Sequence, residues 1–291
     1  MTAPSARPSA GPSPSSVPLL DLPAGAPADG VRPGPDQPRR AWVEQIMGMP
    51  ISVHVRGPLA REEAGVAEDA VGRAMAGLRR VDAVFSTYRA DSEISRIRAG
   101  TLAVAAADPW VQEVVALCDQ ARDRTGGWFD AHLPGPDGVR RFDPTGLVKG
   151  WAIERAARAL AADLPGHDVL VNAGGDVALR CDRTDTPDWR LGIEDPADRT
   201  RLLATVPLRT GGMATSGTAA RGAHIVVPRT GERVDRAGSV TVVGPDLTWA
   251  DVHATAAFAQ GDGAERYLAT LAGHLSFVVR PDGTTATIEG R

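Results

Sequence analysis

The stretch that decides the fold runs from Phe142 to Leu160 and reads Phe-Asp-Pro-Thr-Gly-Leu-Val-Lys-Gly-Trp-Ala-Ile-Glu-Arg-Ala-Ala-Arg-Ala-Leu. It predicts a loop that leads directly into a helix over residues 146–162. Asp143 and Thr145 are typical N-cap or first-turn residues, and Pro144 fixes φ where a helix begins. An apolar residue recurs at every fourth position of this helix, which predicts that one face is buried in a core. These residues are Val148, Ala152, Ala156 and Leu160.

This helix carries three residues that indicate more than a structural role. Gly146 and Gly150 lie in or beside its first turn, and a glycine inside a helix costs about 1 kcal/mol relative to alanine. We therefore expect something to approach the backbone closely here. Lys149 is the only lysine of the chain. Because an ammonium is a compact charge that suits phosphate or carbonyl oxygens, we favour ligand binding over a solvated helix lysine.

Composition narrows the class of protein. The chain has 291 residues, a formal net charge of -4 and 4% aromatic residues. This length supports one large domain or two small ones, and the lack of a basic block argues against nucleic-acid binding. Cys118 and Cys181 lie far apart without C-x-x-C spacing. They predict free, buried thiols in a reducing compartment, with one disulfide as the alternative.

Residues 1–40 are rich in proline, alanine, glycine and serine, and ten of the chain's 23 prolines lie there. Such a segment buries too little apolar surface to offset its ordering entropy, so we expect a disordered tail before a folded domain over residues 41–291. No apolar signal-peptide core and no lipid-attachment cysteine follow the first residue. No apolar run of 18 residues occurs later. We therefore expect a cytoplasmic protein without a transmembrane segment.

The hydrophobic patterns after residue 41 predict an α+β fold. Strands that follow one another through short turns, with helices grouped rather than alternating, indicate antiparallel sheets with helices packed on their faces. The expected helices cover residues 61–84, 109–124, 146–162, 248–259 and 264–271. The expected strands cover a hairpin over 42–55 and residues 169–172, 177–180, 189–194, 202–206, 213–216, 223–227, 239–243, 275–279 and 284–288.

One helix near the C-terminus carries a candidate metal site. Asp251 and Thr255 are four residues apart and share a helix face. A carboxylate and a hydroxyl suit a hard cation such as Mg²⁺, which takes few protein oxygens. The alternative is that Asp251 only interacts with the helix dipole and that Thr255 has no special role.

Four other features are weak when taken singly. His224 begins a predicted strand and is either a hydrogen-bonded structural residue or a general base. Tyr88 could stack on a planar ring or anchor its loop. The Gly-Gly-Asp sequence at 174–176 could admit a ligand to the backbone, although a hairpin turn is the default interpretation. The sequence Met-Ala-Thr-Ser-Gly at 213–217 offers hydroxyl groups beside a glycine.

Taken in order, these segments resemble the ApbE-type flavin transferases, which are FAD:protein FMN transferases. The resemblance covers residues 41–291, and its specificity lies in nine motifs in register rather than in any one of them. The motifs are Met47-Gly48, Phe-Ser-Thr-Tyr-Arg-Ala-Asp-Ser-Glu-Ile-Ser at 85–95, Gly-Gly-Trp-Phe-Asp at 126–130, Asp-Pro-Thr-Gly-Leu-Val-Lys-Gly-Trp-Ala at 143–152, Val-Asn-Ala-Gly-Gly-Asp-Val at 171–177, Gly-Ile-Glu-Asp-Pro at 192–196, Ala-Thr-Ser-Gly at 214–217, His-Ile-Val-Val-Pro-Arg-Thr-Gly at 224–231 and Ala-Asp-Val-His-Ala-Thr-Ala at 250–256.

The resemblance implies roles for individual residues. It implies that FAD contacts Met47, Tyr88, Trp128, Phe129, Asp130, Asp143, Lys149 and the segment His224–Ile225. It also implies that Mg²⁺ is bound by the backbone carbonyl of Gly146 and by the side chains of Asp251 and Thr255. His224 matches a histidine implicated in proton transfer, so His224 and the metal ligand Asp251 are the expected catalytic residues.

The reaction that the resemblance implies is Mg²⁺-dependent transfer of FMN from FAD to a threonine hydroxyl of an acceptor flavoprotein. The hydroxyl would attack the FMN-side phosphorus and AMP would leave, with the metal ion neutralising charge on the phosphate oxygens. One alternative is a metal-dependent FAD pyrophosphatase, which would use the same residues. Another is a non-catalytic FAD-binding protein, which would not need the Asp251 and Thr255 pair.

Three features depart from the family's usual pattern. Val227 stands where an aspartate usually precedes Pro-Arg-Thr-Gly, so the hydrogen bonds of that carboxylate are lost. The link between Asp130 and Asp143 is short and charged, which leaves the shape of the pocket rim open. Many members are exported lipoproteins, whereas this sequence predicts a cytoplasmic or membrane-peripheral target.

Overall fold

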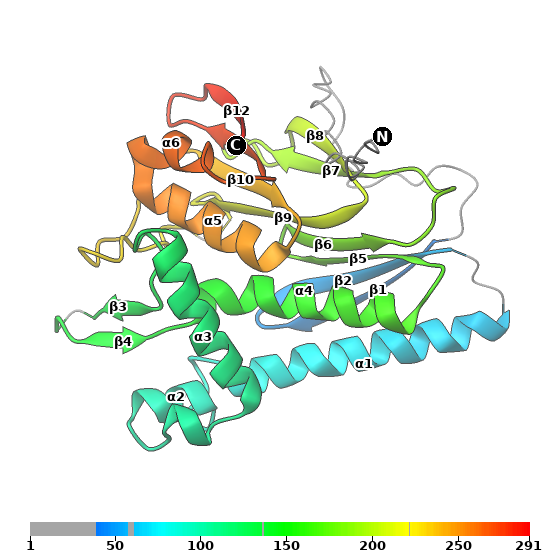
Figure 1. The fold of residues 1–291 in the computed structure, drawn as a ribbon, viewed down its shortest axis with the longest axis horizontal. Helices are drawn as coiled ribbons and strands as arrows, with labels where there is room; N and C mark the ends of the chain where they lie inside the picture. The colour runs from blue at the N-terminus through cyan, green and yellow to red at the C-terminus, as the bar shows by residue number, and fades with distance from the viewer. Residues whose placement is uncertain (1–38, 58–60, 136, 221) are drawn as a thin grey trace, which may run out of the picture.

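An eight-stranded antiparallel sheet forms the centre of the computed structural model, which describes residues 39–57, 61–135, 137–220 and 222–291 (Figure 1). The predicted disordered tail, residues 1–40, lies outside the described residues except for its last two. These two, Arg39 and Arg40, belong to the first strand. The strands, in their order across the sheet, are β1 (Arg39–Ile46), β2 (Met49–Arg56), β5 (Asp168–Ala173), β6 (Asp176–Cys181), β9 (Thr210–Gly217), β10 (Ser239–Gly244), β11 (Leu275–Val279) and β12 (Thr285–Glu289).

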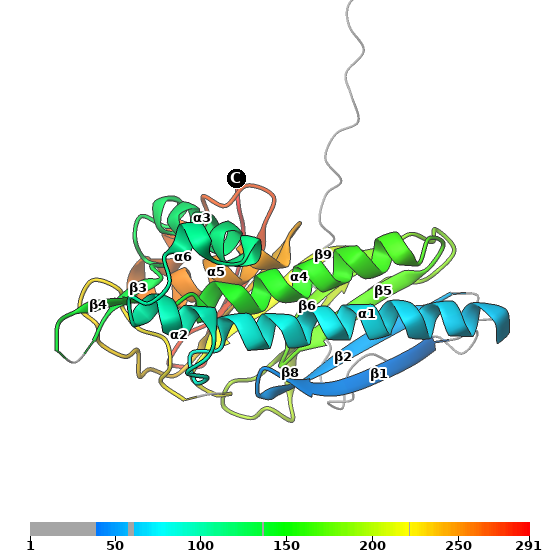
Figure 2. The same cartoon turned by 90° about the horizontal axis from the view of Figure 1, so that it is seen from below.

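Helices cover one face of this sheet. The helix α4 (Thr145–Asp163) packs on β5 and β6, and α5 (Leu247–Gln260) packs on β9 and β10. The helix α1 (Arg61–Phe85) runs beside α4 (Figure 2). All four apolar residues of the predicted stripe on α4 are buried, so the periodicity identified the correct face.

A short hairpin covers the other face of the sheet. It consists of β7 (Trp189–Glu194) and β8 (Leu202–Leu208), which form a separate two-stranded sheet. Side chains alternate between faces along each strand. Accordingly, Leu170 and Val177 join the core under this hairpin, whereas their neighbours Val169 and Ala178 join the core under the helices. The predicted α+β class with antiparallel sheets and helices packed on their faces is confirmed.

Small elements complete the chain, and several of them were not predicted. The helix α2 (Glu93–Arg98) begins at Ser92, whose hydroxyl accepts a hydrogen bond from the backbone N of Ser95 at 3.1 Å. The hairpin of β3 (His132–Pro134) and β4 (Arg140–Phe142) forms the charged link that the sequence left open. The remaining elements are η1 (Val104–Ala106), α3 (Pro109–Arg124), η2 (Gly261–Gly263) and α6 (Ala264–Leu268).

The predicted strand over residues 223–227 was wrong. In its place Val226 forms a single isolated bridge with Arg233. The chain turns back between them, because the backbone N of Gly231 donates to Val227 O and Gly231 has φ of +77°. Pro228 in this turn has no N–H for a ladder hydrogen bond. His224 therefore lies on a loop and not at the start of a strand.

Two expectations from composition can be compared with the described residues. Cys118 is buried and Cys181 is partly buried, and both are free thiols, as predicted. Burial raises the pKa of Cys118 to about 12 and that of Cys181 to about 11. In the described part of the chain, no helix has the length and apolar character needed to cross a membrane.

A buried ion pair ties β2 to β5. Arg56 donates to Asp168 Oδ2 at 2.8 Å from Nη2 and at 3.1 Å from Nε, and both residues are buried. Burial by itself raises the pKa of Asp168. Hydrogen bonds from the Thr186 hydroxyl, the backbone N of Arg183 and Arg56 outweigh this effect, so the pKa lies below its usual value.

We expect Asp168→Asn to lower the free energy of unfolding by about 3 kcal/mol or more, because it leaves the Arg56 guanidinium buried without its counter-charge. Urea denaturation at pH 7 measures this change. Because the folded-state pKa of Asp168 is lowered, its ionised form stabilises the protein at neutral pH, and this contribution is lost as the pH falls. The difference from wild type should therefore shrink below about pH 4.

The matched control is Asp163→Asn. It removes an ion pair between Asp163 and Arg73, whose side chains are 38% and 61% exposed. Such an exposed pair contributes at most about 1 kcal/mol. Equal losses in the two variants would contradict the role assigned to the buried pair.

Candidate active site

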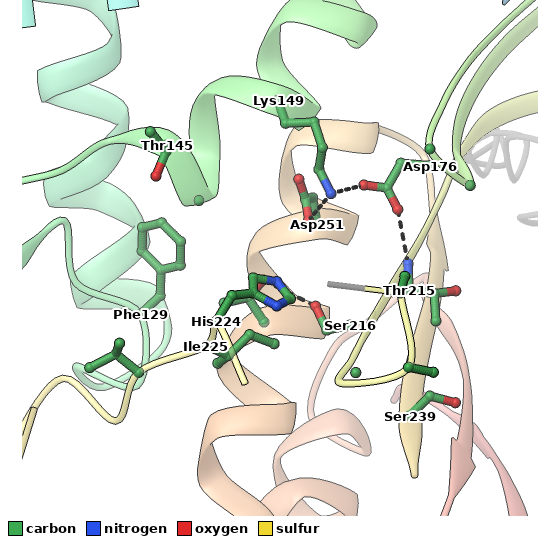
Figure 3. Close-up of a pocket in the computed structure, with 18 of the residues that line it drawn as sticks. Phe129, Thr145, Lys149, Asp176, Thr215, Ser216, His224, Ile225, Ser239 and Asp251 are labelled. Carbon is green, nitrogen blue, oxygen red and sulfur yellow. Dashed lines mark hydrogen bonds and ion pairs between the residues drawn. The ribbon is translucent and has the colours of Figure 1, made fainter. Parts of the chain in front are cut away.

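A cavity of about 600 Å³ lies where the N-terminus of α4, the middle of α5 and the end of β9 meet the segments 219–220 and 222–233 (Figure 3). One part of its lining is apolar and includes Trp128, Phe129, Leu133, Pro134, Ile225 and Pro228. Another part is polar and includes Lys149, Asn172, Asp176, Thr215, Ser216, Asp251 and Thr255. The cavity can therefore hold a ligand that has both a planar apolar part and a charged part.

The start of α4 is fixed by Asp143 next to the cavity. Asp143 Oδ1 accepts hydrogen bonds from the backbone N of Thr145 at 3.1 Å and from its hydroxyl at 2.6 Å. Arg98 Nη2 donates to the other carboxylate oxygen at 3.1 Å. Pro144 occupies the N-cap position, so Asp143 satisfies first-turn donors from one residue earlier than a true N-cap.

Both glycines of this helix are places of close approach, as predicted. A Cβ at Gly146 would lie 3.2 Å from the Phe129 ring, which packs against the first turn. A Cβ at Gly150 would lie 2.9 Å from Asp251 Cβ and 3.1 Å from the carbonyl oxygen of Leu247. The bare backbone at Gly150 thus lets α5 come close enough to place Asp251 beside Lys149.

A buried glutamate holds the same two helices together one turn later. Glu154 Oε2 accepts a hydrogen bond at 3.0 Å from the backbone N of Leu247, the first residue of α5. Its Oε1 accepts from Arg158 Nε at 2.5 Å and from Arg180 of β6. Helices α4 and α5 and the sheet are therefore linked through one carboxylate near the site.

Lys149 lies between two buried carboxylates (Figure 3). Its Nζ forms a short ion pair with Asp176 Oδ2 and lies 3.6 Å from Asp251 Oδ1. Asp176 and Asp251 are each 2% exposed. In such surroundings charge interactions are stronger than in water. Because two carboxylates face one ammonium, this cluster has a net negative charge and is suited to a further cation.

The hydroxyl groups of β9 and α5 meet beside this cluster. Ser216 Oγ and Thr255 Oγ1 are 3.1 Å apart, within hydrogen-bond distance. The backbone N of Thr215 donates to Asp176 Oδ1 at 3.1 Å. The end of β9 therefore contacts both the cluster around Lys149 and the face of α5 that carries Thr255.

Two arginines hold the aromatic side of the cavity in place. The Arg229 guanidinium lies 5.2 Å from the centre of the Trp128 ring and donates to Gly126 O at 3.2 Å. Arg140 donates to Asp130 Oδ2 at 2.6 Å and to the carbonyl oxygen of Pro228 at 3.3 Å. These contacts join the β3–β4 hairpin to the loop that carries His224, which defines the rim that the sequence left open.

His224 is exposed at the rim, and one hydrogen bond defines its tautomer. Its Nδ1 lies 2.9 Å from the carbonyl oxygen of Gly222. A carbonyl oxygen only accepts hydrogen bonds, so Nδ1 carries the proton in this contact. Nε2 of the neutral ring is then the nitrogen that can take up a proton.

The cavity brings together ten of the twelve residues singled out from the sequence. They are Trp128, Phe129, Asp130, Asp143, Gly146, Lys149, His224, Ile225, Asp251 and Thr255. Met47 and Tyr88 do not line it. Met47 lies in the turn between β1 and β2 with φ of +54°, and Tyr88 is 97% exposed in the turn after α1. Their contacts with FAD stay predictions.

Sequence reasoning missed Asp176 and Ser216 as site residues. Asp176 ends a Gly-Gly-Asp sequence whose default interpretation is a plain hairpin turn, and Ser216 belongs to a motif that is weak by itself. One signal for Asp176 was available, because a carboxylate at the start of a buried strand needs a counter-charge. Nothing in the sequence pairs that position with Lys149, which lies 27 residues earlier.

The donors around Asp251 suit a hard cation better than a soft one. The carboxylate of Asp251, the hydroxyl of Thr255 and backbone carbonyls are the oxygen ligands that Mg²⁺ takes. Among the described residues, no group of three or more His, Cys, Asp or Glu side chains could hold a metal ion. A metal here would have few carboxylate ligands, as is common for Mg²⁺ that also binds substrate phosphates.

Comparison with known proteins relates this architecture to solved structures. The ApbE protein of Thermotoga maritima has a TM-score of 0.73 and 19% identity, over 87% of this chain and 97% of that chain. The flavinyl transferase ApbE of Pseudomonas stutzeri has a TM-score of 0.71 and 22% identity, over 87% and 95%. The flavin transferase ApbE of Vibrio cholerae has a TM-score of 0.70 and 20% identity, over 87% and 97%.

At these identities the likeness to solved structures shows the fold. A comparison with curated proteins found no match. The sequence profile of the ApbE family matches residues 47–135 and 133–279, which is well over half of the chain. With the same fold and a profile match of this extent, the chain belongs to the ApbE family.

Proposed function

We propose that this protein is a flavin transferase that moves FMN from FAD to a threonine hydroxyl of an acceptor protein, with Mg²⁺ as cofactor and AMP as the second product. We further propose that the activity resides in one domain, residues 41–291. Family membership supports the general activity, and two of the solved structures compared above are named flavin or flavinyl transferases. The position of Lys149 among buried carboxylates at the polar side of an aromatic-lined cavity carries the proposal.

The lining of the cavity matches the chemical parts of FAD. The side formed by Trp128, Phe129 and Ile225 offers an apolar surface for the flavin ring. Lys149 offers a rotatable ammonium for the diphosphate oxygens. Gly146 is exposed at the N-terminus of α4, where backbone N–H groups and the helix dipole favour an anion. This arrangement would place the phosphate groups between the aromatic side and the cluster around Lys149.

The residues that would hold Mg²⁺ are Asp251, Thr255 and the carbonyl of Gly146. When bound, the ion would neutralise charge on the transferring and leaving phosphate oxygens. The negative balance of charge around Lys149 supports this assignment, because two carboxylates and one ammonium leave one negative charge for the cation.

The chemistry needs a proton acceptor for the attacking hydroxyl. His224 is exposed at the rim, where an acceptor protein can reach it, and its Nε2 is the nitrogen that can take up a proton. The threonine oxygen would form a bond to the FMN-side phosphorus while the bond from that phosphorus to the AMP oxygen breaks. The hydroxyl proton would pass to His224, and AMP would leave with the bonding electron pair.

The decisive test of the proposed function is the product formed from FAD. We expect incubation with FAD, Mg²⁺ and a candidate FMN-domain acceptor to add the mass of FMN less water to the acceptor, with one AMP released per acceptor. Intact-mass spectrometry and AMP chromatography measure both. An acceptor with its target threonine replaced by alanine is the control. Release of FMN and AMP with no labelled acceptor would instead identify an FAD pyrophosphatase. If no AMP forms at all, the protein is a non-catalytic flavin-binding protein.

Asp251→Asn should lower the rate of Mg²⁺-dependent AMP release by at least about 100-fold, since even the groups that only orient metal ligands are worth about 10- to 100-fold. Binding of FAD, followed by quenching of flavin fluorescence, should be reduced less. Asp246→Asn is the matched control, because Asp246 is the N-cap of α5, where its side chain accepts a hydrogen bond from the backbone N of Trp249, and asparagine is an equally good N-cap. Unchanged AMP release by Asp251→Asn would remove the metal assignment.

Gly150→Ala tests the close contact between α4 and α5. The added methyl group would overlap Asp251 Cβ and approach the Leu247 carbonyl, so we expect the helices to separate, with weaker binding of Mg²⁺. Titration of AMP release with Mg²⁺ should show a rise in the concentration needed for half-maximal rate. Gly72→Ala on α1 is the control, because its Cβ would meet nothing within 4 Å. Matching behaviour of the two variants would contradict this role of Gly150.

A further inference from the structure

Asp176 is a buried carboxylate held at both of its oxygens (Figure 3). Its Oδ1 accepts a hydrogen bond from the backbone N of Thr215 at 3.1 Å, and its Oδ2 forms the short ion pair with Lys149. A carboxylate held on both sides has a single orientation. Asp176 is therefore a fixed anchor for the lysine ammonium.

The turn that leads to Asp176 is also fixed. Gly174 and Gly175 have φ of +61° and +100°, which glycine adopts at little steric cost. Asn172 Oδ1 accepts a hydrogen bond from the backbone N of Gly175 at 3.1 Å. Asp176 is the first residue of β6, and β9 with Thr215 pairs alongside. The sheet, rather than α4 or α5, thus sets the position of Asp176.

Lys149, in contrast, has a carboxylate on either side within reach. Its backbone is fixed, because the neighbouring Gly150 packs directly against Asp251. Its side chain has a flexible four-carbon stem. The ammonium forms the short ion pair with Asp176 and a longer ion pair, at 3.6 Å, with Asp251 Oδ1. If the charge at position 176 were lost, a small rotation of the stem would let the ammonium pair closely with Asp251.

We propose that Asp176 is a positioning residue that holds the Lys149 ammonium on the sheet side of the cavity and thereby keeps it from competing with a divalent cation at Asp251. This inference rests on the proposed function. Two cations at one buried carboxylate repel each other, so the ammonium and the metal ion need separate anions. Asp176 supplies the closer anion for the lysine, so Asp251 keeps only the longer ion pair with Lys149 and the metal ion can bind there.

The test is a double-mutant cycle on cation affinity, measured without turnover of an acceptor. Free Mn²⁺ is counted by electron paramagnetic resonance in the protein alone and again with FAD, for wild type, Asp176→Asn, Lys149→Met and the double variant. Asp176→Asn should weaken Mn²⁺ binding by about tenfold or more. Lys149→Met should strengthen Mn²⁺ binding in both backgrounds, and by about tenfold more in the Asp176→Asn background than in the wild-type background.

Each outcome decides the inference. If removal of Lys149 changes Mn²⁺ affinity by the same factor in both backgrounds, Asp176 acts as a metal ligand or only as part of the fold, and the inference fails while the proposed function stands. If the wild-type protein takes up no Mn²⁺, the metal part of the proposed function fails together with the inference. Equal urea midpoints show that the variants fold. Asp176→Ser, whose hydroxyl can still accept from Thr215, replaces the asparagine variant if that variant does not fold.

Discussion

The structure depends on the close contact between α4 and α5 at Gly150. A side chain at this position would overlap Asp251, so the absence of a Cβ determines how near the two helices come. Glu154 lies one turn further along α4, and its carboxylate accepts a hydrogen bond from the backbone N of Leu247, the first residue of α5. This hydrogen bond holds the two helices together beside the Gly150 contact. Without this approach, Asp251 and Lys149 would not share a buried site.

The sheet supplies the other half of the site. Its strands β6 and β9 run antiparallel beside each other, so the start of one lies near the end of the other. Asp176 comes from the start of β6, and Thr215 and Ser216 come from the end of β9. Helices and sheet thus contribute opposite sides of one polar cluster. Asp176 and Asp251 are almost fully buried. The packing of the surrounding helices and strands therefore determines the distance between the two carboxylates.

The aromatic side of the cavity is built differently and from less regular structure. Trp128 and Phe129 follow the end of α3, and Ile225 lies on the loop that replaced a predicted strand. The guanidinium groups of Arg229 and Arg140 join these segments across the rim. A rim made of loops joined by side chains can differ in shape among family members while the polar cluster stays on helices and strands.

Much of the fold and part of the site could be predicted because they depend on local patterns. The apolar stripe of α4 has helical spacing, and the residues of β7 and β11 alternate or form short apolar runs, so these elements were located correctly. The segment 223–227 has the composition of a strand, yet no neighbouring strand pairs with it beyond one bridge. Strand formation needs a partner, and a partner is not a local property.

The sequence by itself determined which residues have unusual chemistry: a single lysine between two helical glycines, and Asp251 and Thr255 one turn apart on one helix. These properties follow from residue identity and helical spacing. Only the tertiary structure decided that Asp176 is the partner of Lys149 and that Gly150 faces Asp251. Both contacts join segments far apart in the chain, and the physical reason they form is the packing of α4 and α5 on one face of the sheet.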